Sequence, residues 1–344
     1  MDKNIILLLD YRDQFYFSTR HRGASVNVEK LRKYLSNNGF DLIIKHFYEI
    51  DLRIEDYKDK WVIYQSSEDP GLSYKDYIED ILLGLKIQGA HLIPDFKYFR
   101  AHHNKVFMEI LRDMLEICEI KNIQSKAFGT YEEYIRSRYL HSEDSFIIKP
   151  GSGTRSRDVS LLKTHSDKKI LPYKISRSFT FDNIKLFLTK IKTGKPFTSM
   201  SNNRKKFIIQ NYIPDLKGDY RVIIYGNKYY TVFRKNRKND FRASGSGMFE
   251  SDPQIPPGLF DCAKSIYEKI DVPYMTLDLA HKDGIFYLFE FQCLCLGQLF
   301  FEKSKHYYKL EMNGTWGKYI EQPDLEREIA KTVSVYIKEK ICVE

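Results

Sequence analysis

The sequence predicts an α/β protein in which a doubly wound parallel sheet is followed by a region of antiparallel strands. Over about the first hundred residues, short aliphatic runs alternate with amphipathic segments that end at glycine, a pattern typical of parallel sheets covered by helices. Later in the chain, β-branched and aromatic runs flank a Gly-Asn turn at 226–227 and an Asp-Gly turn at 283–284, which are typical of hairpins. A chain of 344 residues with this order of signals favours two or three subdomains.

Polar residues follow the strands of the predicted parallel region. Its elements are strands at 4–10, 41–47, 60–67 and 91–94 and helices at 27–38 and 74–89. Ligands of parallel sheets bind beyond the carboxyl ends of the strands, so residues 10–13 and 65–71 could contact a substrate. Ordinary turn chemistry explains the same residues equally well.

The elements after the parallel region alternate less regularly. A long helix at 103–117 leads into a small α/β module that runs to about residue 207, after which strands predominate. The later elements are strands at 206–214, 219–235 and 274–292, the last two being hairpins, and helices at 259–270 and 324–341.

The composition is that of a soluble globular protein, with 42% hydrophobic and 29% charged residues. The net charge of +9 suits an anionic partner. Apart from residues 203–206 and 233–242, however, the positive side chains are scattered, whereas nucleic-acid-binding proteins concentrate them on one face. We therefore expect a small phosphate-bearing ligand rather than nucleic acid.

Cysteine usage and the first residues bear on location. The five cysteines show no zinc-ligand spacing and are odd in number, which argues against a disulfide scaffold. The apolar run Ile5–Leu9 is too short for a signal peptide or a membrane span. We expect a cytoplasmic protein without a membrane partner.

Three side chains in the second hairpin could bind a divalent cation. Glu290 and Gln292 point to the same face of one strand, and hairpin pairing can bring Asp278 opposite them. Two carboxylates and an amide oxygen are hard ligands, of the kind that surrounds Mg²⁺ shared with substrate phosphates. Taken alone, the pattern favours a solvated strand face on which the acids occur by chance.

A second group of residues could bind phosphate. Lys149 ends an apolar strand directly before a loop rich in Gly, Ser and Thr, so its ammonium and the loop N–H groups could meet phosphate oxygens. The order is the reverse of a Walker loop, and no P-loop is predicted. The apolar run 207–213 could contact an adenine, and Arg234, Lys235 and Arg242 place cations where a transferred phosphoryl group would need them.

In the order and spacing of these motifs the chain resembles the ATP-grasp carboxylate–amine ligases, in the branch of glutathione synthetase and the ribosomal-protein glutamate ligase. The resemblance implies an ATP-grasp fold in three parts. Residues 1–100 would form an N-terminal pre-ATP-grasp α/β domain, 101–207 a small lid subdomain with its entry helix, and 208–344 the C-terminal antiparallel-sheet subdomain with the metal site.

Carried over motif by motif, the resemblance implies the site residues. The nucleotide-binding residues would be Lys105, Lys149, Gly151, Ser152 and Gly153 of the lid loop 151–157, Gln210, Asn211, Tyr212 and Ile213 of the adenine segment, and Asp219. The catalytic residues would be Arg221, Arg234 and Arg242, and the metal ligands Asp278, Glu290 and Gln292. Three features depart from the family pattern. Gln292 stands where asparagine is usual, Ser244 stands where the nearest branch often has asparagine, and the run 293–297 stands where Ser-Pro-Gly is common.

The resemblance also implies a reaction and its partners. A carboxylate attacks the γ-phosphate of ATP to give an acyl phosphate and ADP, and an amine then displaces phosphate; the lid must close, because water would hydrolyse the acyl phosphate. ATP and two Mg²⁺ ions would be required. The substrates would be a small carboxylate, anionic because of the basic residues at 20–23 and Arg242, and an amine. A sugar acid of a surface glycan, an amino acid or a peptide would fit, and a homodimer is frequent among relatives.

Two other functions stay open. An enzyme of the same fold could phosphorylate its substrate without ligation. The positive charge and 25 tyrosines would also suit a non-catalytic protein that binds RNA or peptide, and such binding would weaken steeply with salt and need neither ATP nor Mg²⁺. The three oxygen ligands at 278–292 argue against this second alternative.

Overall fold

The computed structural model divides the chain into two compact units. Unit 1 comprises Met1–His102, Leu111–Lys121 and Leu216–Glu344, and unit 2 comprises His103–Ile110 and Asn122–Asp215. The structure describes residues 3–15, 26–67, 69, 71–117, 120, 123–153, 158–178, 180–193, 200–238, 240–243, 245 and 247–343. The three-part organisation with boundaries at residues 100 and 207 stays a prediction.

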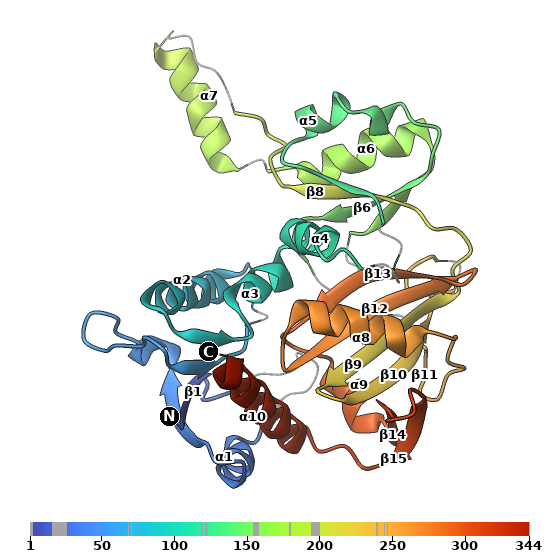
Figure 1. The fold of residues 1–344 in the computed structure, drawn as a ribbon. Coiled ribbons are helices and arrows are strands. Elements are labelled where there is room, and N and C mark those ends of the chain that lie inside the picture. Colours follow the sequence, from blue (N-terminus) through green and yellow to red (C-terminus); the bar gives the residue numbers. More distant parts are fainter. Residues whose placement is uncertain are drawn as a thin grey trace. The chain divides into compact units, whose positions relative to one another are not determined.

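Unit 1 begins with a four-stranded parallel sheet in the order β2-β1-β3-β4 (Figure 1). Its elements are β1 (Asn4–Leu9), α1 (Val28–Asn37), β2 (Asp41–His46), the 3₁₀ turn η1 (Phe47–Glu49), β3 (Trp61–Ile63), α2 (Ser73–Gln88) and β4 (His91–Ile93). Strand β1 is buried on both faces, since Ile5 and Leu7 enter one core and Ile6 and Leu8 another. The predicted parallel sheet is confirmed.

The rest of unit 1 is built on a seven-stranded sheet in the order β13-β12-β9-β10-β14-β15, with β11 added to β10. Its elements are β9 (Gly218–Tyr225), β10 (Lys228–Lys235), β11 (Phe249–Glu250), α8 (Leu259–Ile270), β12 (Tyr274–Lys282), β13 (Ile285–Gln292), α9 (Gln298–Lys303), β14 (His306–Leu310), β15 (Trp316–Ile320) and α10 (Leu325–Val343). The two predicted hairpins, β9–β10 and β12–β13, are confirmed and antiparallel.

Helix α10 packs into a core that the two sheets of unit 1 share. Ile329, Val333 and Ile337 of α10 lie in one buried cluster with Ile5 of β1 and Tyr225 of β9. Figure 1 shows α10, in dark red, beside α1. Both sheets therefore contribute to one hydrophobic core.

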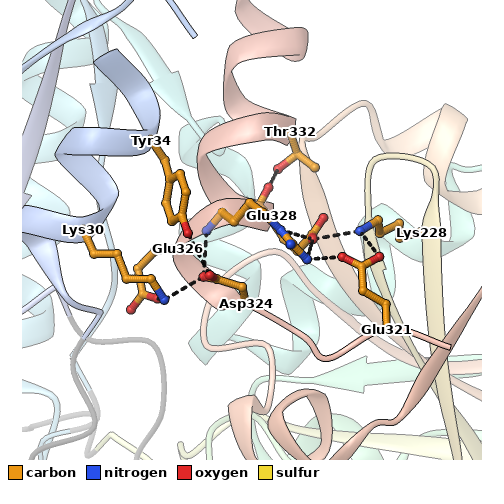
Figure 2. Close-up of polar contacts among 9 residues, drawn as sticks. Lys30, Tyr34, Lys228, Glu321, Asp324, Glu326, Glu328 and Thr332 are labelled. Carbon is orange, nitrogen blue, oxygen red and sulfur yellow. Dashed lines mark hydrogen bonds and ion pairs between the residues drawn. The ribbon is translucent and has the colours of Figure 1, made fainter. Parts of the chain in front are cut away.

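An ion cluster at the start of α10 strengthens this junction (Figure 2). On the side of α1, Lys30 pairs with Asp324 at 2.9 Å and with Glu326 at 3.1 Å. On the side of β10, Lys228 pairs with Glu328 at 2.9 Å, and Glu328 is 1% exposed. The same lysine pairs with Glu321 at 2.8 Å, and Arg327 contacts both of its glutamates. The cluster thus connects α1, α10 and β10 by charge.

Unit 2 contains a four-stranded antiparallel sheet in the order β5-β8-β6-β7. Its elements are β5 (Ser125–Phe128), α5 (Tyr131–Ile135), the 3₁₀ turn η2 (Arg138–Leu140), β6 (Phe146–Pro150), β7 (Ser160–Leu162), α6 (His165–Ser176), α7 (Phe181–Thr193) and β8 (Phe207–Asn211). One sheet face carries Phe146, Ile148, Phe207 and Ile209, which form a core with Tyr134 of α5. The opposite face carries Lys149 and Gln210 together with the buried Ile147 and Ile208.

The helix predicted at 103–117 is shorter in the structure. Two helices occupy the region, α3 (Phe96–His103) and α4 (Lys105–Asp113). Asn104 separates them, and its side chain accepts from the backbone N–H of Phe107 at 3.3 Å, as at a helix start. None of the helices in the described ranges is both long and apolar enough to cross a membrane.

Candidate functional site

Four charged side chains on the sheet of unit 1, three of them buried and Arg221 half-buried, form what we call the buried quartet. Strand β9 lies between β10 and β12, and its Asp219 and Arg221 stand opposite Arg234 and Asp278. Arg234 donates from Nε and Nη2 to the two carboxylate oxygens of Asp219 at 2.6 and 2.7 Å. Arg221 donates to both oxygens of Asp278 at 2.9 and 3.0 Å. Arg234 also reaches Asp278 at 2.7 Å, so the four charges form one connected group.

Within the quartet Asp278 is held in its charged form, whereas burial raises the pKa of Asp219. Asp219, Arg234 and Asp278 are each no more than 6% exposed. Burial by itself raises the pKa of Asp278, but the guanidinium groups of Arg221 and Arg234 more than offset this and lower the pKa to about 2. Removing one member would leave a buried charge without its partner, which is costly. The sheet therefore holds two arginines in fixed positions.

Arg221 has two further neighbours after β13. Its guanidinium carbon lies 5.8 Å from the ring centroid of Phe300, within the range of a cation–π contact. Gly297 has a φ of +85°, and a Cβ atom built on it would lie 3.2 Å from Nη1 of Arg221. Glycine is needed there both for its backbone conformation and for the close approach of the arginine.

The three predicted metal ligands lie on paired strands. Asp278 of β12 stands opposite Glu290 of β13, and an irregularity in the register follows directly after Asp278. Gln292 donates from Nε2 to Oε1 of Glu290 at 2.8 Å, and both side chains are half-buried. Within the described ranges no group of three or more His, Cys, Asp or Glu side chains is gathered as in a metal centre. The hairpin thus brings the predicted ligands to one region, and their role stays a prediction.

Unit 2 contains both predicted lysines. Lys105, at the first position of α4, donates its backbone N–H to the carbonyl of Gly151 at 2.9 Å, and its ammonium contacts the carbonyl of Gly153. A Cβ atom on Gly151 would come within 2.5 Å of the Lys206 side chain and 2.8 Å of its carbonyl oxygen. The start of the predicted lid loop is therefore packed against Lys105 and Lys206. Residues 154–157 of that loop lie outside the described residues, as does Ser244.

Lys149 lies beside an acid that sequence reasoning missed. Its ammonium is 3.4 Å from Oε1 of Glu109 on α4, and Glu109 also accepts from Gln210 Nε2, at 3.4 Å on Oε1 and 3.3 Å on Oε2. Glu109 and Gln210 are 4% and 3% exposed. In the sequence Glu109 is one acid within an amphipathic helix, between Met108 and Ile110, and it does not stand out from ordinary helical glutamates.

The other predicted contacts are more local. The N–H of Asn211 donates to the carbonyl of Gln124 at 3.0 Å and that of Tyr212 to Ser145 at 3.4 Å, while Ile213 follows half-buried. These bonds fix the start of the predicted adenine segment.

Arg242 and Lys235 each pair with a nearby acid. Arg242 donates from Nη2 to Asp240 at 2.6 Å, and the largely exposed Lys235 is 3.6 Å from Glu250. None of the described interactions joins either side chain to the buried quartet. Ser152, in the loop after β6, is exposed.

The polar ends of the parallel strands make turn contacts. Asp10 accepts from the backbone N–H groups of Arg12 and Gln14, at 2.8 and 3.1 Å, which is ordinary turn chemistry. Gln65 is 3% exposed and accepts from the N–H of Cys295 at 3.3 Å, joining the end of β3 to the segment after β13. Residues 20–23, predicted to favour an anionic substrate, lie outside the described residues.

Solved structures share this fold over nearly the whole chain. D-cycloserine synthetase DcsG is 11% identical with a TM-score of 0.54, covering 96% of this chain and 99% of that one. A RimK-domain ATP-grasp protein from Sphaerobacter thermophilus DSM 20745 is 10% identical with a TM-score of 0.52, covering 97% and 98%. The ATP-grasp ligase PsnB, in a complex with minimal precursor, Mg and ADP, is 11% identical with a TM-score of 0.53, covering 98% and 99%.

At such low identities the likeness concerns the fold. No protein-family model matches the sequence, and no curated protein matches it. The mixed architecture, with a parallel sheet followed by antiparallel sheets, agrees with these neighbours along the chain, and the predicted fold class is confirmed. This chain has the ATP-grasp fold.

Proposed function

We propose that this protein is an ATP-dependent ligase that joins a carboxylate to an amine through an acyl phosphate and releases ADP and phosphate. One observation carries the proposal: on the antiparallel sheet of an ATP-grasp fold, Asp219 and Asp278 hold the half-buried Arg221 and the buried Arg234 in fixed orientations. Guanidinium groups held in this way stabilise developing phosphoryl charge without having to reorganise. The PsnB complex with Mg and ADP, which shares the fold, supports a nucleotide as the ligand.

The proposed first step transfers the γ-phosphoryl group. Lys105 and Lys149 would bind phosphate oxygens, and Arg221 and Arg234 would face the transferred group. An oxygen of the substrate carboxylate attacks the γ-phosphorus, the bond to the bridging β–γ oxygen breaks, and ADP leaves with that electron pair.

The proposed second step forms the amide. The amine nitrogen attacks the carbonyl carbon of the acyl phosphate, and phosphate leaves with the electrons of the carbon–oxygen bond while the nitrogen loses a proton. The intermediate carries negative charge on oxygen, which the same arginines would stabilise. Arg242 is proposed to assist, although its described partner is Asp240.

The hairpin residues fit Mg²⁺ by their chemistry. Asp278, Glu290 and Gln292 offer carboxylate and amide oxygens, the donors that Mg²⁺ prefers. When bound, Mg²⁺ would neutralise phosphate charge. Asp278 would then have two functions, because both of its oxygens already accept from arginines. Two ions are proposed.

An anionic carboxylate is the proposed substrate. The net charge of +9 and the fixed arginines favour a substrate with more than one negative charge. A sugar acid of a surface glycan, an amino acid or a peptide would meet this requirement. A structure of PsnB with its precursor peptide supports including peptides.

Hydroxylamine tests the proposal without knowledge of the natural amine. A panel of anionic carboxylates is incubated with ATP, Mg²⁺ and hydroxylamine, and both ADP and hydroxamate are measured. A ligase produces the two in equal amounts, because hydroxylamine intercepts the acyl phosphate. ADP and a phosphorylated product without hydroxamate would instead identify a kinase, and no ADP with any carboxylate would contradict the proposal.

Matched variants locate the activity. Lys149→Ala and Glu290→Ala are expected to lower ADP release by about a hundredfold or more while the chain stays folded. Lys126→Ala, on an exposed position of β5, and Glu268→Ala, 60% exposed on α8, remove the same kinds of charge as controls. Full activity in either test variant would contradict its assignment.

A further inference from the structure

One face of the unit 2 sheet carries two polar side chains in an apolar setting. In the register of β6 and β8, Ile147 stands opposite Gln210 and Lys149 opposite Ile208, so these four side chains share a face. The other face forms the hydrophobic core of the unit. Lys149 and Gln210 are thus neighbours on the face that meets Glu109 of α4.

A single buried carboxylate joins the two polar side chains. Glu109 is 4% exposed, and its Oε1 lies 3.4 Å from both the ammonium of Lys149 and Nε2 of Gln210. Its Oε2 lies 3.3 Å from the same amide nitrogen. A carboxylate only accepts hydrogen bonds, so Gln210 must turn its NH₂ group toward Glu109.

The orientation of this amide has a consequence for the opposite atom. With Nε2 directed at Glu109, Oε1 of Gln210 is the atom left for another partner, and it can only accept. The hydrogen bonds described for the side chain of Gln210 use Nε2 alone. Gln210 is only 3% exposed, so if a ligand placed another acceptor against this oxygen, no water could take the place of the missing donor.

We propose that Glu109 is a specificity-determining positioning residue, which fixes the amide of Gln210 so that the site accepts a base with an exocyclic amino donor and rejects one with a carbonyl at the same position. The inference rests on the proposed function, in which Gln210 belongs to the adenine segment. Adenine carries an amino group at its sixth position, and hypoxanthine carries an oxygen there. The same carboxylate holds Lys149, so base and phosphate recognition share one anchor.

Calorimetric titration with ADP and IDP in the presence of Mg²⁺ tests the inference. The two nucleotides have identical phosphates, so the ratio of their dissociation constants cancels any change in the charge around Lys149. Wild-type protein is expected to bind ADP about tenfold or more tightly than IDP. In Glu109→Gln the neighbouring amide can offer either atom to Gln210, so the ratio should fall below about threefold.

Three further variants keep the test decisive. Glu143→Gln removes a carboxylate from an exposed position of the same unit and should leave the ratio unchanged. Gln210→Leu should abolish the preference for ADP, and in that background Glu109→Gln should have no further effect on the ratio, since Glu109 acts through Gln210. If Glu109→Gln does not fold, the ratio of the ADP and IDP dissociation constants of Gln210→Leu alone tests the inference.

The outcomes separate this inference from the proposed function. Wild-type protein that binds neither nucleotide would overturn both. Wild-type protein that binds ADP while Glu109→Gln, or Gln210→Leu, retains the full preference over IDP would overturn only the role of Glu109. Equal binding of ADP and IDP by the wild type would likewise overturn only the role of Glu109.

Discussion

Replacing Lys228 by methionine should destabilise unit 1 strongly, because it removes a cation from the interior of the ion cluster in Figure 2. The side chain of Lys228 is 9% exposed and that of its partner Glu328 is 1% exposed. Removing one partner of a buried ion pair costs about 3–5 kcal/mol. Arg327 still contacts Glu328 at 3.0 Å, so we expect a cost at or below the lower end of this range, about 2–3 kcal/mol.

The melting temperature should reflect this loss. At roughly 2–4 °C per kcal/mol for a unit of this size, Lys228→Met should unfold about 5–10 °C below the wild type. The double variant Lys228→Met/Glu328→Gln should recover part of the loss, because it removes the buried charge that the single variant leaves behind. Thermal unfolding followed by circular dichroism measures all three proteins under one condition.

A lysine on the surface of the same cluster provides the control. Lys30 is 42% exposed and pairs with Asp324 and Glu326, so Lys30→Met should cost less than about 1 kcal/mol. Equal effects of Lys228→Met and Lys30→Met would refute the argument from burial. A double variant no more stable than Lys228→Met would refute the argument from the uncompensated charge.

Two other predictions concern the close approach of Gly297 to Arg221 and the loss of the Glu321 charge at low pH. Gly297→Ala should lower turnover about tenfold, because the added methyl group displaces Arg221. Gly314→Ala is the control: its φ is a similar +82° and no atom lies near its Cβ, so it should cost only the backbone strain of roughly 1–3 kcal/mol. ADP release and melting temperature distinguish the two variants, and equal turnover in both would contradict the contact with Arg221. Burial raises the pKa of Glu321, but the hydrogen bond from Lys228 is among the causes that lower this pKa overall. The ionised Glu321 therefore stabilises the folded state above its unfolded pKa near 4.5, and this stabilisation is lost as the pH falls through the lower folded pKa. The difference in melting temperature between wild type and Lys228→Met should therefore narrow below about pH 4.5, and a constant difference down to pH 3 would count against this cause.

The elements that depend on local pattern could be predicted from the sequence. The continuous apolar run of β1 and the turns at 226–227 and 283–284 follow from residues next to one another in the chain, and so does the pairing of Asp278 with Glu290 across a tight hairpin. The hairpin β14–β15 was missed, although its Asn313–Gly314 turn is a strong signal of the same kind.

The buried quartet could not be predicted, because it depends on which strands become neighbours. β9 pairs with β12 across a long intervening segment, and only this pairing brings Asp278 to Arg221. Arg234 then reaches Asp278 from two strands away. The sequence supported a role for each residue separately, but their charges compensate one another only in the folded sheet.

The charge balance of this sheet makes two of the proposed metal ligands behave differently. Asp278 belongs to a quartet of two carboxylates and two guanidinium groups without net charge, so Asp278→Asn leaves both arginines with one carboxylate and destabilises the sheet whether or not a cation binds. Glu290 is half-buried, and the partner described for it is the neutral amide of Gln292. The uncompensated negative charge of the proposed ligands therefore resides on Glu290, which would supply most of the attraction for a cation, while Asp278 would add a ligand oxygen whose charge the arginines already balance. A loss of activity in Glu290→Gln at unchanged melting temperature would thus report a cation site, whereas a loss that always accompanies lower stability would report an ion cluster that serves the fold.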